Sequence, residues 1–274
     1  MLDHLDGATR VYFVIGDPIA QVKAPARMTR GFAQRGVNAV VVPMRVPVPE
    51  FDAFMRGAAH AKNLDGMIIT VPHKLAASRY AAAATGRVEL TGAVNVLRRD
   101  ATGQWFGETT DGLSFVAGIR AAGCEPRGMR ALVVGAGGAG SAIALALIEA
   151  GVAELAIHSR TPGPRDRLLG LLRARHLTTP IVAGSADPAG FDLVVNATSA
   201  GMRPDDPLPV LADRLSSTTF VGDVITAPEV TPLLAAARAR GCPTETGIGM
   251  VSAAIGLMLD FFVAGIAGRD GSLR

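Results

Sequence analysis

The glycine-rich segment from Gly135 to Gly140 constrains the fold of this chain more than any other feature. It has the spacing G-x-G-x-x-G, follows the apolar run Arg130–Val134 and opens the alanine-rich stretch Ala139–Ala150. In a strand, turn and helix of this kind the first glycine permits a tight turn, the second lets backbone approach a pyrophosphate, and the third lets helix and strand pack closely. The segment predicts a Rossmann-type domain that binds a dinucleotide. The residues assigned to the cofactor here are Gly135, Ala136, Gly137, Gly138 and Ala139.

Short apolar runs alternate with helical patterns on both sides of this segment. The strands expected before it are Arg10–Ile15, Ala39–Val46 and Gly66–Val71, separated by helices at Ala26–Arg35 and Pro49–Ala61. The strands expected from it onward are Arg130–Val134, Glu154–His158, Pro180–Ala183, Leu193–Asn196 and Phe220–Val224. Such alternation predicts parallel sheets covered by helices. We therefore expect an α/β protein with two domains.

The domain boundaries follow from this division. Residues 1–111 together with 248–274 are expected to form a substrate domain that carries the catalytic groups, and residues 112–247 a parallel-sheet cofactor domain. A hairpin is expected around the turn-prone residues 100–103, and the apolar stretch Met250–Val263 is expected to be a helix that packs on the first domain. Ligands of two-domain α/β proteins usually bind at the carboxyl ends of the strands.

The end of the strand Glu154–His158 indicates which nicotinamide cofactor is bound. An acidic residue there would accept hydrogen bonds from a free ribose 2′-hydroxyl, whereas the sequence continues with Ser159, Arg160 and Thr161, followed by Arg165. A guanidinium offers a planar, charge-assisted fork for phosphate oxygens. The sequence therefore predicts NADP(H) rather than NAD(H).

Composition excludes several other classes. With 49% hydrophobic and 19% charged residues, the chain has enough apolar material for real cores and too little charge for disorder. The net charge is only +3, and no basic run is interleaved with aromatic residues, so nucleic acid is not an expected partner. Residues 131–148 lack charge, but their glycine cluster breaks them into a strand and a helix, so no membrane span is expected there.

The two cysteines, Cys124 and Cys242, have neither the number nor the spacing of a disulfide framework or a metal site. We expect no metal and buried thiols in a reducing compartment. The polar, acidic N-terminus is unlike a secretory signal, so the expected location is the cytoplasm. Monomer and homodimer both stay open.

A second polar constellation lies outside the cofactor segment. The run Ile69-Thr70-Val71-Pro72-His73-Lys74 delivers a lysine just after a strand, at the carboxyl edge of the sheet. Gly92–Val96 and Gly107–Gly112 then place Asn95 and Asp111 where the chain enters the same cleft. His73 alternates away from Lys74 if the backbone is still extended there, so a structural role is expected for it rather than that of a proton relay. Lys23 and Glu108 are expected to be structural or solvated.

These segments, together with Gly16–Ala20 and Asn196–Met202, resemble those of the shikimate/quinate dehydrogenase family, and the resemblance extends over essentially the whole chain. It implies an NADP-dependent alcohol dehydrogenase of aromatic amino acid biosynthesis that acts on a small cyclic substrate. In such a reaction a hydride passes between the alcohol carbon and the nicotinamide while a protein group takes up or gives back the hydroxyl proton.

The resemblance also implies roles for individual residues. Lys74 and Asp111 correspond to the catalytic pair, and Thr70 and Asn95 to residues that bind ring hydroxyls. The residues that correspond to the cofactor contacts of the family are Ser159, Arg160, Thr161, Asn196, Thr198, Val224 and Gly247.

The sequence departs from the family on the substrate side. The two serine hydroxyls that hold the substrate carboxylate are replaced by Val22 and Ala24, a substrate-binding tyrosine by Thr226, and a glutamine of the closing helix by Ala254. Loss of one such donor costs about 1 to 3 kcal/mol when a charged partner is left unpaired. We expect an altered pocket in which shikimate itself is a poor substrate. The alternative is a non-catalytic NADP(H)-binding sensor or regulatory protein, against which the retained Lys74 and Asp111 argue.

Overall fold

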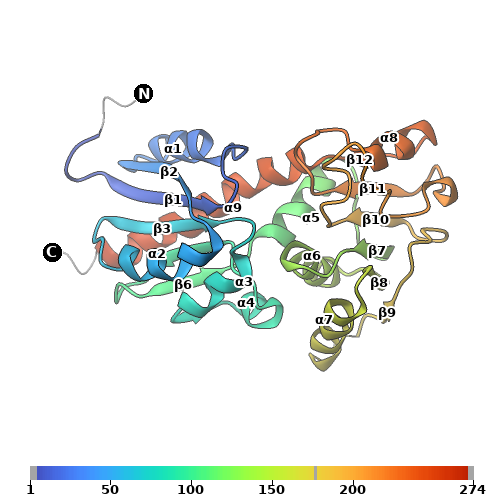
Figure 1. Ribbon diagram of the computed structural model, residues 1–274, viewed down its shortest axis with the longest axis horizontal. Coiled ribbons are helices and arrows are strands. Elements are labelled where there is room, and N and C mark those ends of the chain that lie inside the picture. Colours follow the sequence, from blue (N-terminus) through green and yellow to red (C-terminus); the bar gives the residue numbers. More distant parts are fainter. Residues whose placement is uncertain (1–4, 176–177, 271–274) are drawn as a thin grey trace. The chain divides into compact units, whose positions relative to one another are not determined.

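The computed structural model describes residues 5–175 and 178–270, and its contacts divide the chain into two units. Unit 1 consists of Met1–Thr110 and Ile255–Arg274, and unit 2 of Asp111–Ala254. Each unit contains one six-stranded sheet with helices packed on it (Figure 1). The α/β class is confirmed.

The sheet of unit 1 is mixed. Its order is β2-β1-β3-β5-β6-β4, in which β1 is parallel to β2 and β3, and β5 is antiparallel to both β3 and β6. The strands are β1 (Arg10–Gly16), β2 (Ala39–Arg45), β3 (Leu64–Ile69), β4 (Ala83–Ala84), β5 (Val96–Arg99) and β6 (Trp105–Glu108). The hairpin expected around residues 100–103 is the β5–β6 pair.

Alternate residues of β1 supply the two faces of this sheet, as a strand period of two requires. On one face Tyr12 stacks on Phe32 of α1 (Ala24–Gln34) with ring centroids 4.5 Å apart, and lies 4.8 Å from Phe262 of α9 (Gly247–Asp270). On the other face Ile15 belongs to a buried cluster that includes Phe51 of α2 (Phe51–Ala58), preceded by the short 3₁₀ helix η1 (Val48–Glu50). The short helices α3 (Lys74–Ala77), η2 (Ser78–Tyr80) and α4 (Gly86–Thr91) complete the unit.

Helix α9 is the last element and contributes to the core of unit 1. Between Gly247 and Ile266 it is long and apolar enough to cross a bilayer by length and composition alone. Leu259 and Phe262 are nevertheless buried, and a Cβ atom at Gly66 of β3 would lie 2.7 Å from the Phe262 ring. The C-terminal part of α9 is therefore a core helix of unit 1.

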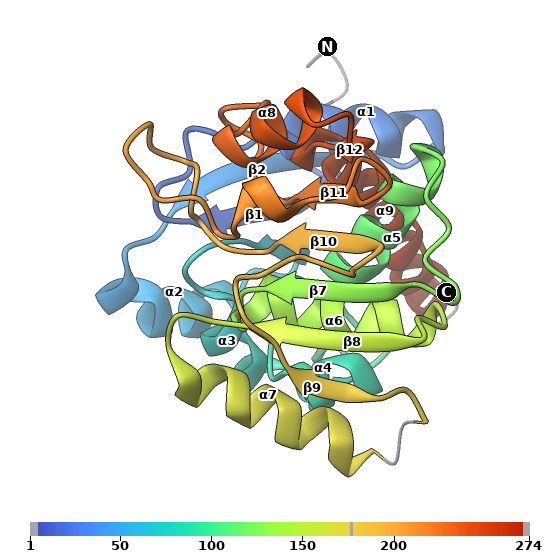
Figure 2. The same ribbon diagram turned by 90° about the vertical axis from the view of Figure 1, so that its right-hand side faces the viewer.

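The sheet of unit 2 is entirely parallel, with the order β12-β11-β10-β7-β8-β9 (Figure 2). Its strands are β7 (Arg130–Val134), β8 (Glu154–His158), β9 (Ile181–Ala183), β10 (Leu193–Asn196), β11 (Phe220–Asp223) and β12 (Thr244–Glu245). In chain order this is the doubly wound arrangement 6-5-4-1-2-3, whose strand order reverses between β7 and β10. The predicted Rossmann-type fold is confirmed.

Helices cover both faces of this second sheet. The helices are α5 (Asp111–Ala121), α6 (Gly138–Glu149), α7 (Pro162–Ala174), η3 (Ala212–Arg214) and α8 (Pro232–Ala239). Phe115 of α5 packs against Gly222 of β11, where a Cβ atom would lie 2.7 Å from its ring. On the other face Leu132 and Val194 belong to one buried cluster with Leu233 of α8. Both layers leave the carboxyl ends of β7, β8 and β10 free to carry a site.

Candidate active site

A cavity of about 510 Å³ lies in unit 2 at the carboxyl ends of β7, β8 and β10. This is the position where the strand order reverses and where dinucleotides bind in doubly wound folds, and its volume is in the range of small-molecule sites. The residues that line it are Val134, Gly135, Ala136, Gly137, His158, Ser159, Arg160, Thr161, Pro164, Ala186, Ala197, Thr198, Ser199, Ala200, Pro207, Leu208 and Pro209.

The glycine segment forms the floor of this cavity. Gly135 has a φ of 113°, which favours glycine, and a Cβ atom there would lie 2.7 Å from the Ala197 carbonyl oxygen. Its N–H donates to the His158 carbonyl oxygen at 2.8 Å, which joins the loop to β8. A Cβ atom at Gly140 would overlap the Gly135 carbonyl oxygen, so the start of α6 packs directly on the turn. Backbone N–H groups at the start of α6 are thereby available to a phosphate group.

Arg160 gives the β8 side of the cavity its charge. It is exposed and lines the cavity between Ser159 and Thr161, and none of the described lining residues is acidic. A carboxylate would repel a 2′-phosphate, whereas a guanidinium binds one. The residues present therefore fit NADP(H).

The loop after β10 is held by a buried hydrogen-bond network. The Asn196 amide donates to the Ala200 carbonyl and to the Asp223 carboxylate, both at 3.0 Å, and its oxygen accepts from the Thr198 hydroxyl at 2.7 Å. Thr231, the N-cap of α8, donates to the same carboxylate at 2.8 Å. Asn196 is fully buried and uses its side chain inside the protein, so it shapes the cavity wall that Thr198 lines.

Burial raises the pKa of Asp223 above its ordinary value of 3.8, and the hydrogen bonds from Asn196, Thr231 and the Ile225 N–H only partly oppose this. The native state therefore binds this proton more tightly than the unfolded state. The quantity to follow is the unfolding free energy of the wild type minus that of Asp223→Asn. This difference is expected to decrease as pH rises from 3.8 to the pKa of Asp223 in the native state. The slope is at most about 1.4 kcal/mol per pH unit, and it vanishes above the native pKa.

Urea unfolding of both proteins across the acidic range measures this slope. In Asp223→Asn, the side-chain oxygen can still accept from the Ile225 N–H, but the new amide group faces the Asn196 amide, which is also a donor. A difference in unfolding free energy that does not depend on pH is therefore expected in addition to the slope. Asp205→Asn, at an exposed position of the same unit, is the matched control. A difference between wild type and Asp223→Asn that does not change with pH would contradict the assignment.

The other residues predicted for the cofactor are not among those that line the cavity. Gly138 and Ala139 form the first turn of α6, and the Arg165 side chain donates to Asp166 at 2.8 Å. Val224 and Gly247 are close together, since a Cβ atom at Gly247 would lie 2.6 Å from the Val224 carbonyl oxygen.

In unit 1, backbone hydrogen bonds gather the predicted substrate residues at one edge of the sheet. The Ile69 N–H, directly before Thr70, donates to the Asn95 carbonyl at 2.7 Å, and the Val94 N–H donates to the Lys74 carbonyl at 2.9 Å. The Thr70 N–H itself donates to Ile15 at the end of β1. Thr70 and Lys74, from one segment of the chain, thus come together with Asn95 from a second segment.

His73 fixes the turn that presents Lys74. Its ring is 2% exposed, stacks on Phe51 with centroids 4.2 Å apart, and donates from Nε2 to the Val46 carbonyl at 2.7 Å. Lys74 begins α3 and is half-buried. The structural role expected for His73 is confirmed, although the reason is its own packing rather than strand alternation.

Asn95 is joined to the segment that leads into α5. The Thr110 N–H donates to Asn95 Oδ1 at 2.8 Å, and Asn95 Nδ2 donates to Thr110 Oγ1 at 3.0 Å. Asp111 follows as the first residue of α5 and is 6% exposed. Glu108, expected to be structural or solvated, is buried here and takes part in the same polar network.

The positions where the sequence departs from the family carry apolar or small side chains. Val22 and Ala24 in unit 1 are half-buried, and Val22 follows the Gly16–Ala20 segment, whose Asp17 N–H donates to the Val71 carbonyl beside Thr70. In unit 2, Thr226 is half-buried and Ala254 is buried in α9.

Sequence reasoning missed part of the cavity. The turn after Gly201 contributes Pro207, Leu208 and Pro209, and β8 contributes His158. A proline-rich segment after a strand-end Asn-Ala-Thr could have indicated a wall of the cavity. Among residues 5–175 and 178–270, no group of three or more His, Cys, Asp or Glu could hold a metal ion.

Comparisons with known proteins agree with this geometry. Residues 14–97 match the family model for the shikimate dehydrogenase substrate binding domain. The chain is 38% identical to the NADP(+) shikimate dehydrogenase of Rubrobacter xylanophilus over 248 residues, which cover 89% of this chain and 87% of that protein.

Solved structures extend the likeness to the whole fold. The shikimate 5-dehydrogenase of Thermus thermophilus, in complex with NADP(H) and shikimate, is 28% identical with a TM-score of 0.80 and covers 93% of this chain and 94% of that one. The ligand-free 5-ketofructose reductase of a Gluconobacter species is 29% identical with a TM-score of 0.81, over 93% of both chains. These matches confirm the predicted family, enzyme class and cofactor. The chain is a member of the shikimate dehydrogenase family and an NADP-dependent oxidoreductase.

Proposed function

We propose that the protein transfers a hydride between NADP(H) and a secondary alcohol or ketone of a cyclic, polyhydroxylated substrate, with Lys74 and Asp111 as its catalytic pair. The observation that carries this proposal is the convergence of Thr70, Lys74 and Asn95 at one sheet edge of unit 1, held by the Ile69–Asn95 and Val94–Lys74 backbone hydrogen bonds. A hydroxyl, a lysine amino group and an amide in one place can bind neighbouring ring hydroxyls, and the amino group can exchange a proton with one of them.

Each residue has a separate task in this proposal. Thr70 and Asn95 bind ring hydroxyls and set the orientation of the ring. Lys74 takes the proton of the reacting hydroxyl during oxidation and returns it during reduction, and Asp111 orients Lys74 and accepts a hydrogen bond from the substrate. In unit 2, the glycine segment holds the pyrophosphate of NADP(H) and Arg160 its 2′-phosphate. When bound, the nicotinamide supplies or accepts the hydride.

We propose further that the preferred substrate lacks the carboxylate of shikimate. Val22 and Ala24 are half-buried side chains without hydrogen-bond donors, at the positions where the family resemblance places two serines. One solved structure of similar fold is a 5-ketofructose reductase, so the fold is also found in a reductase not named for shikimate. An uncharged polyol or its ketone suits this wall better than a carboxylate does.

Restoration of the two hydroxyls tests the substrate proposal. In Val22→Ser/Ala24→Ser, kcat/KM for shikimate oxidation with NADP is expected to rise about 10- to 100-fold, mainly through a lower KM, because hydrogen bonds to a charged group contribute about 1.5 to 3 kcal/mol. Val48→Ser, at an exposed valine of the same unit, is the matched control. Efficient shikimate oxidation by the wild type, with no gain in the double variant, would refute the proposed substrate class.

The expected location is also a proposal. We place the protein in the cytoplasm, in agreement with Cys124 and Cys242, which are free and buried. Burial raises the pKa of the Cys124 thiol to about 11, so this side chain stays a neutral core thiol at physiological pH.

A further inference from the structure

Glu108 is a buried carboxylate for which the proposed reaction has no task. It is the last residue of β6 and is 8% exposed. A buried carboxylate needs hydrogen-bond donors or an opposite charge. Glu108 Oε1 accepts from the Thr85 hydroxyl at 2.8 Å and from the Thr109 N–H at 2.7 Å, and Oε2 lies 3.6 Å from Arg87 Nη1.

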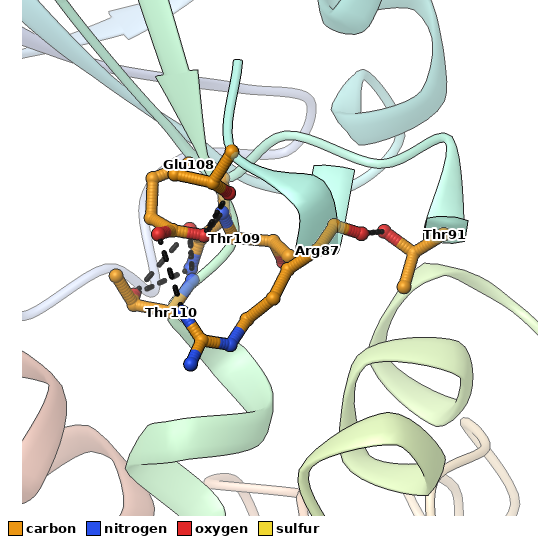
Figure 3. A network of polar contacts seen from close by, with 7 residues as sticks. Arg87, Thr91, Glu108, Thr109 and Thr110 are labelled. Atoms are coloured by element: carbon orange, nitrogen blue, oxygen red, sulfur yellow. Dashed lines mark hydrogen bonds and ion pairs between the residues drawn. The ribbon is translucent and has the colours of Figure 1, made fainter. Parts of the chain in front are cut away.

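These contacts fix the turn that follows β6. Figure 3 shows Glu108, Arg87, Thr109 and Thr110 in one polar network. The Thr109 N–H is held by Glu108, and the next N–H along the chain, that of Thr110, is held by Asn95 Oδ1. Two successive backbone N–H groups therefore donate to two different side chains, those of Glu108 and Asn95. One of them, Asn95, is a proposed substrate residue.

A backbone hydrogen bond closes this arrangement. The Asn95 N–H donates to the Glu108 carbonyl at 3.1 Å, so Asn95 and the Glu108 turn are connected through both backbone and side chains. Thr109 and Thr110 are 2% and 3% exposed, so water offers no replacement for a lost partner. If the Glu108 carboxylate were removed, the Thr109 N–H would lose its acceptor and the turn would have to move.

We propose that Glu108 is a positioning residue: through Thr109 it sets the Thr110–Asn95 pair, and through that pair the orientation in which the substrate ring binds. This inference rests on the proposed function, because Asn95 is assigned there to a ring hydroxyl. Small displacements of positioning groups cause large losses in rate. Glu108 itself touches neither substrate nor cofactor in the proposed arrangement.

Replacement of Glu108 separates the positioning role from the charge. In Glu108→Ala, kcat/KM for shikimate oxidation with NADP is expected to fall about 10- to 100-fold, mainly through KM, while the Kd for NADPH stays unchanged. Glu108→Gln keeps an oxygen that accepts from both Thr85 and Thr109, so it recovers most of that loss. Glu50→Ala, at an exposed glutamate of unit 1, is the control.

A double-mutant cycle with Thr110→Val tests the route of the effect. If Glu108 acts through the Thr110–Asn95 pair, Glu108→Ala adds little to the loss already caused by Thr110→Val. If the two residues acted independently, the fold-losses in kcat/KM of the two single variants would multiply in the double variant. Multiplication of the two losses would therefore overturn the proposal.

Amide hydrogen exchange provides a readout that does not depend on activity. Exchange at the Thr110 N–H is expected to be about 10- to 100-fold faster in Glu108→Ala than in the wild type, with the Thr70 N–H, bonded to Ile15, as the internal reference. If Glu108→Ala fails to fold, Thr85→Val takes its place in both experiments. It is expected to lower kcat/KM and to speed Thr110 exchange several-fold, and Thr85→Ser, which restores the hydroxyl, is expected to reverse both effects.

The outcomes separate this inference from the proposed function. A wild type that binds NADPH but oxidises neither shikimate nor an uncharged cyclic polyol refutes the proposed function. Turnover in the wild type, with Glu108→Ala equal to it in kcat/KM or with unchanged Thr110 exchange, overturns the role of Glu108. Loss of activity to the same extent in Glu108→Gln and Glu108→Ala also overturns it, because the charge would then matter rather than the position.

Discussion

Lys74→Ala is expected to lower kcat for alcohol oxidation by about 10²- to 10⁴-fold, the usual contribution of a positioned proton acceptor. Lys74 is held at the start of α3 by the His73 turn and by the Val94–Lys74 backbone bond, so removal of its side chain leaves the local backbone in place. The Kd for NADPH is expected to stay the same because the whole cofactor cavity lies within unit 2. Steady-state kinetics and a fluorescence titration with NADPH measure the two quantities.

Lys62→Ala is the control for this experiment, since Lys62 is an exposed lysine of the same unit. It should retain wild-type kcat and KM. A Lys74→Ala protein that keeps kcat within a few-fold of the wild type would remove Lys74 from the chemistry. A parallel loss of NADPH binding would indicate instead that Lys74 supports the fold or the cofactor.

Arg160→Ala is expected to weaken NADPH binding by about 10- to 150-fold, the equivalent of about 1.5 to 3 kcal/mol for hydrogen bonds to a charged group. NADH binding should change little, because NADH has no 2′-phosphate for this guanidinium. This preference is expected because Arg160 is exposed beside Ser159 and Thr161, where β8 reaches the cavity. None of the residues that line the cavity in the described part of the chain is acidic. Isothermal titration with both cofactors measures the change in preference.

Arg167→Ala provides the matched control, because Arg167 is an exposed arginine of α7 that does not line the cavity. Its cofactor preference should equal that of the wild type. Equal losses of NADPH and NADH affinity in Arg160→Ala would mean that the side chain supports the cavity rather than the 2′-phosphate.

Five of the six strands of unit 2 could be predicted from sequence to within one residue, whereas the two-residue strand β12 was not predicted. The ranges Arg130–Val134, Glu154–His158 and Leu193–Asn196 are observed as expected. Buried parallel strands are continuous apolar runs bounded by turn residues, so both their type and their ends are visible in the sequence. The glycine segment between β7 and α6 could be located for the same reason.

The third strand of unit 1 shows where such reasoning fails. It was expected at Gly66–Val71 and is observed at Leu64–Ile69. At its start Asp65 is buried, which a strand pattern does not suggest, because its carboxylate pairs with Arg10 of β1 at 2.6 Å. At its end Pro72 lacks the N–H that a continued strand would need.

Glu108 could not be assigned from sequence for a related reason. A carboxylate in the segment Gly107–Gly112 is solvated or buried depending on whether donors reach it, and its partners Thr85 and Arg87 come from a distant part of the chain. The same holds for Asp223, whose partners Asn196 and Thr231 come from β10 and the start of α8. Burial of an ionisable group is decided by such tertiary partners, not by the local pattern.

The transfer of the hydride itself is the most direct test of the central claim. Purified protein is incubated with NADP and with shikimate or an uncharged cyclic polyol that carries deuterium at the carbinol carbon, and the reduced cofactor is analysed by mass spectrometry. Deuterium is expected in the NADPH that the wild type forms, and none with Lys74→Ala on the same time scale. A wild-type protein that binds NADPH tightly but moves no deuterium from any of these alcohols would contradict the proposed hydride transfer, and would favour a cofactor-binding sensor.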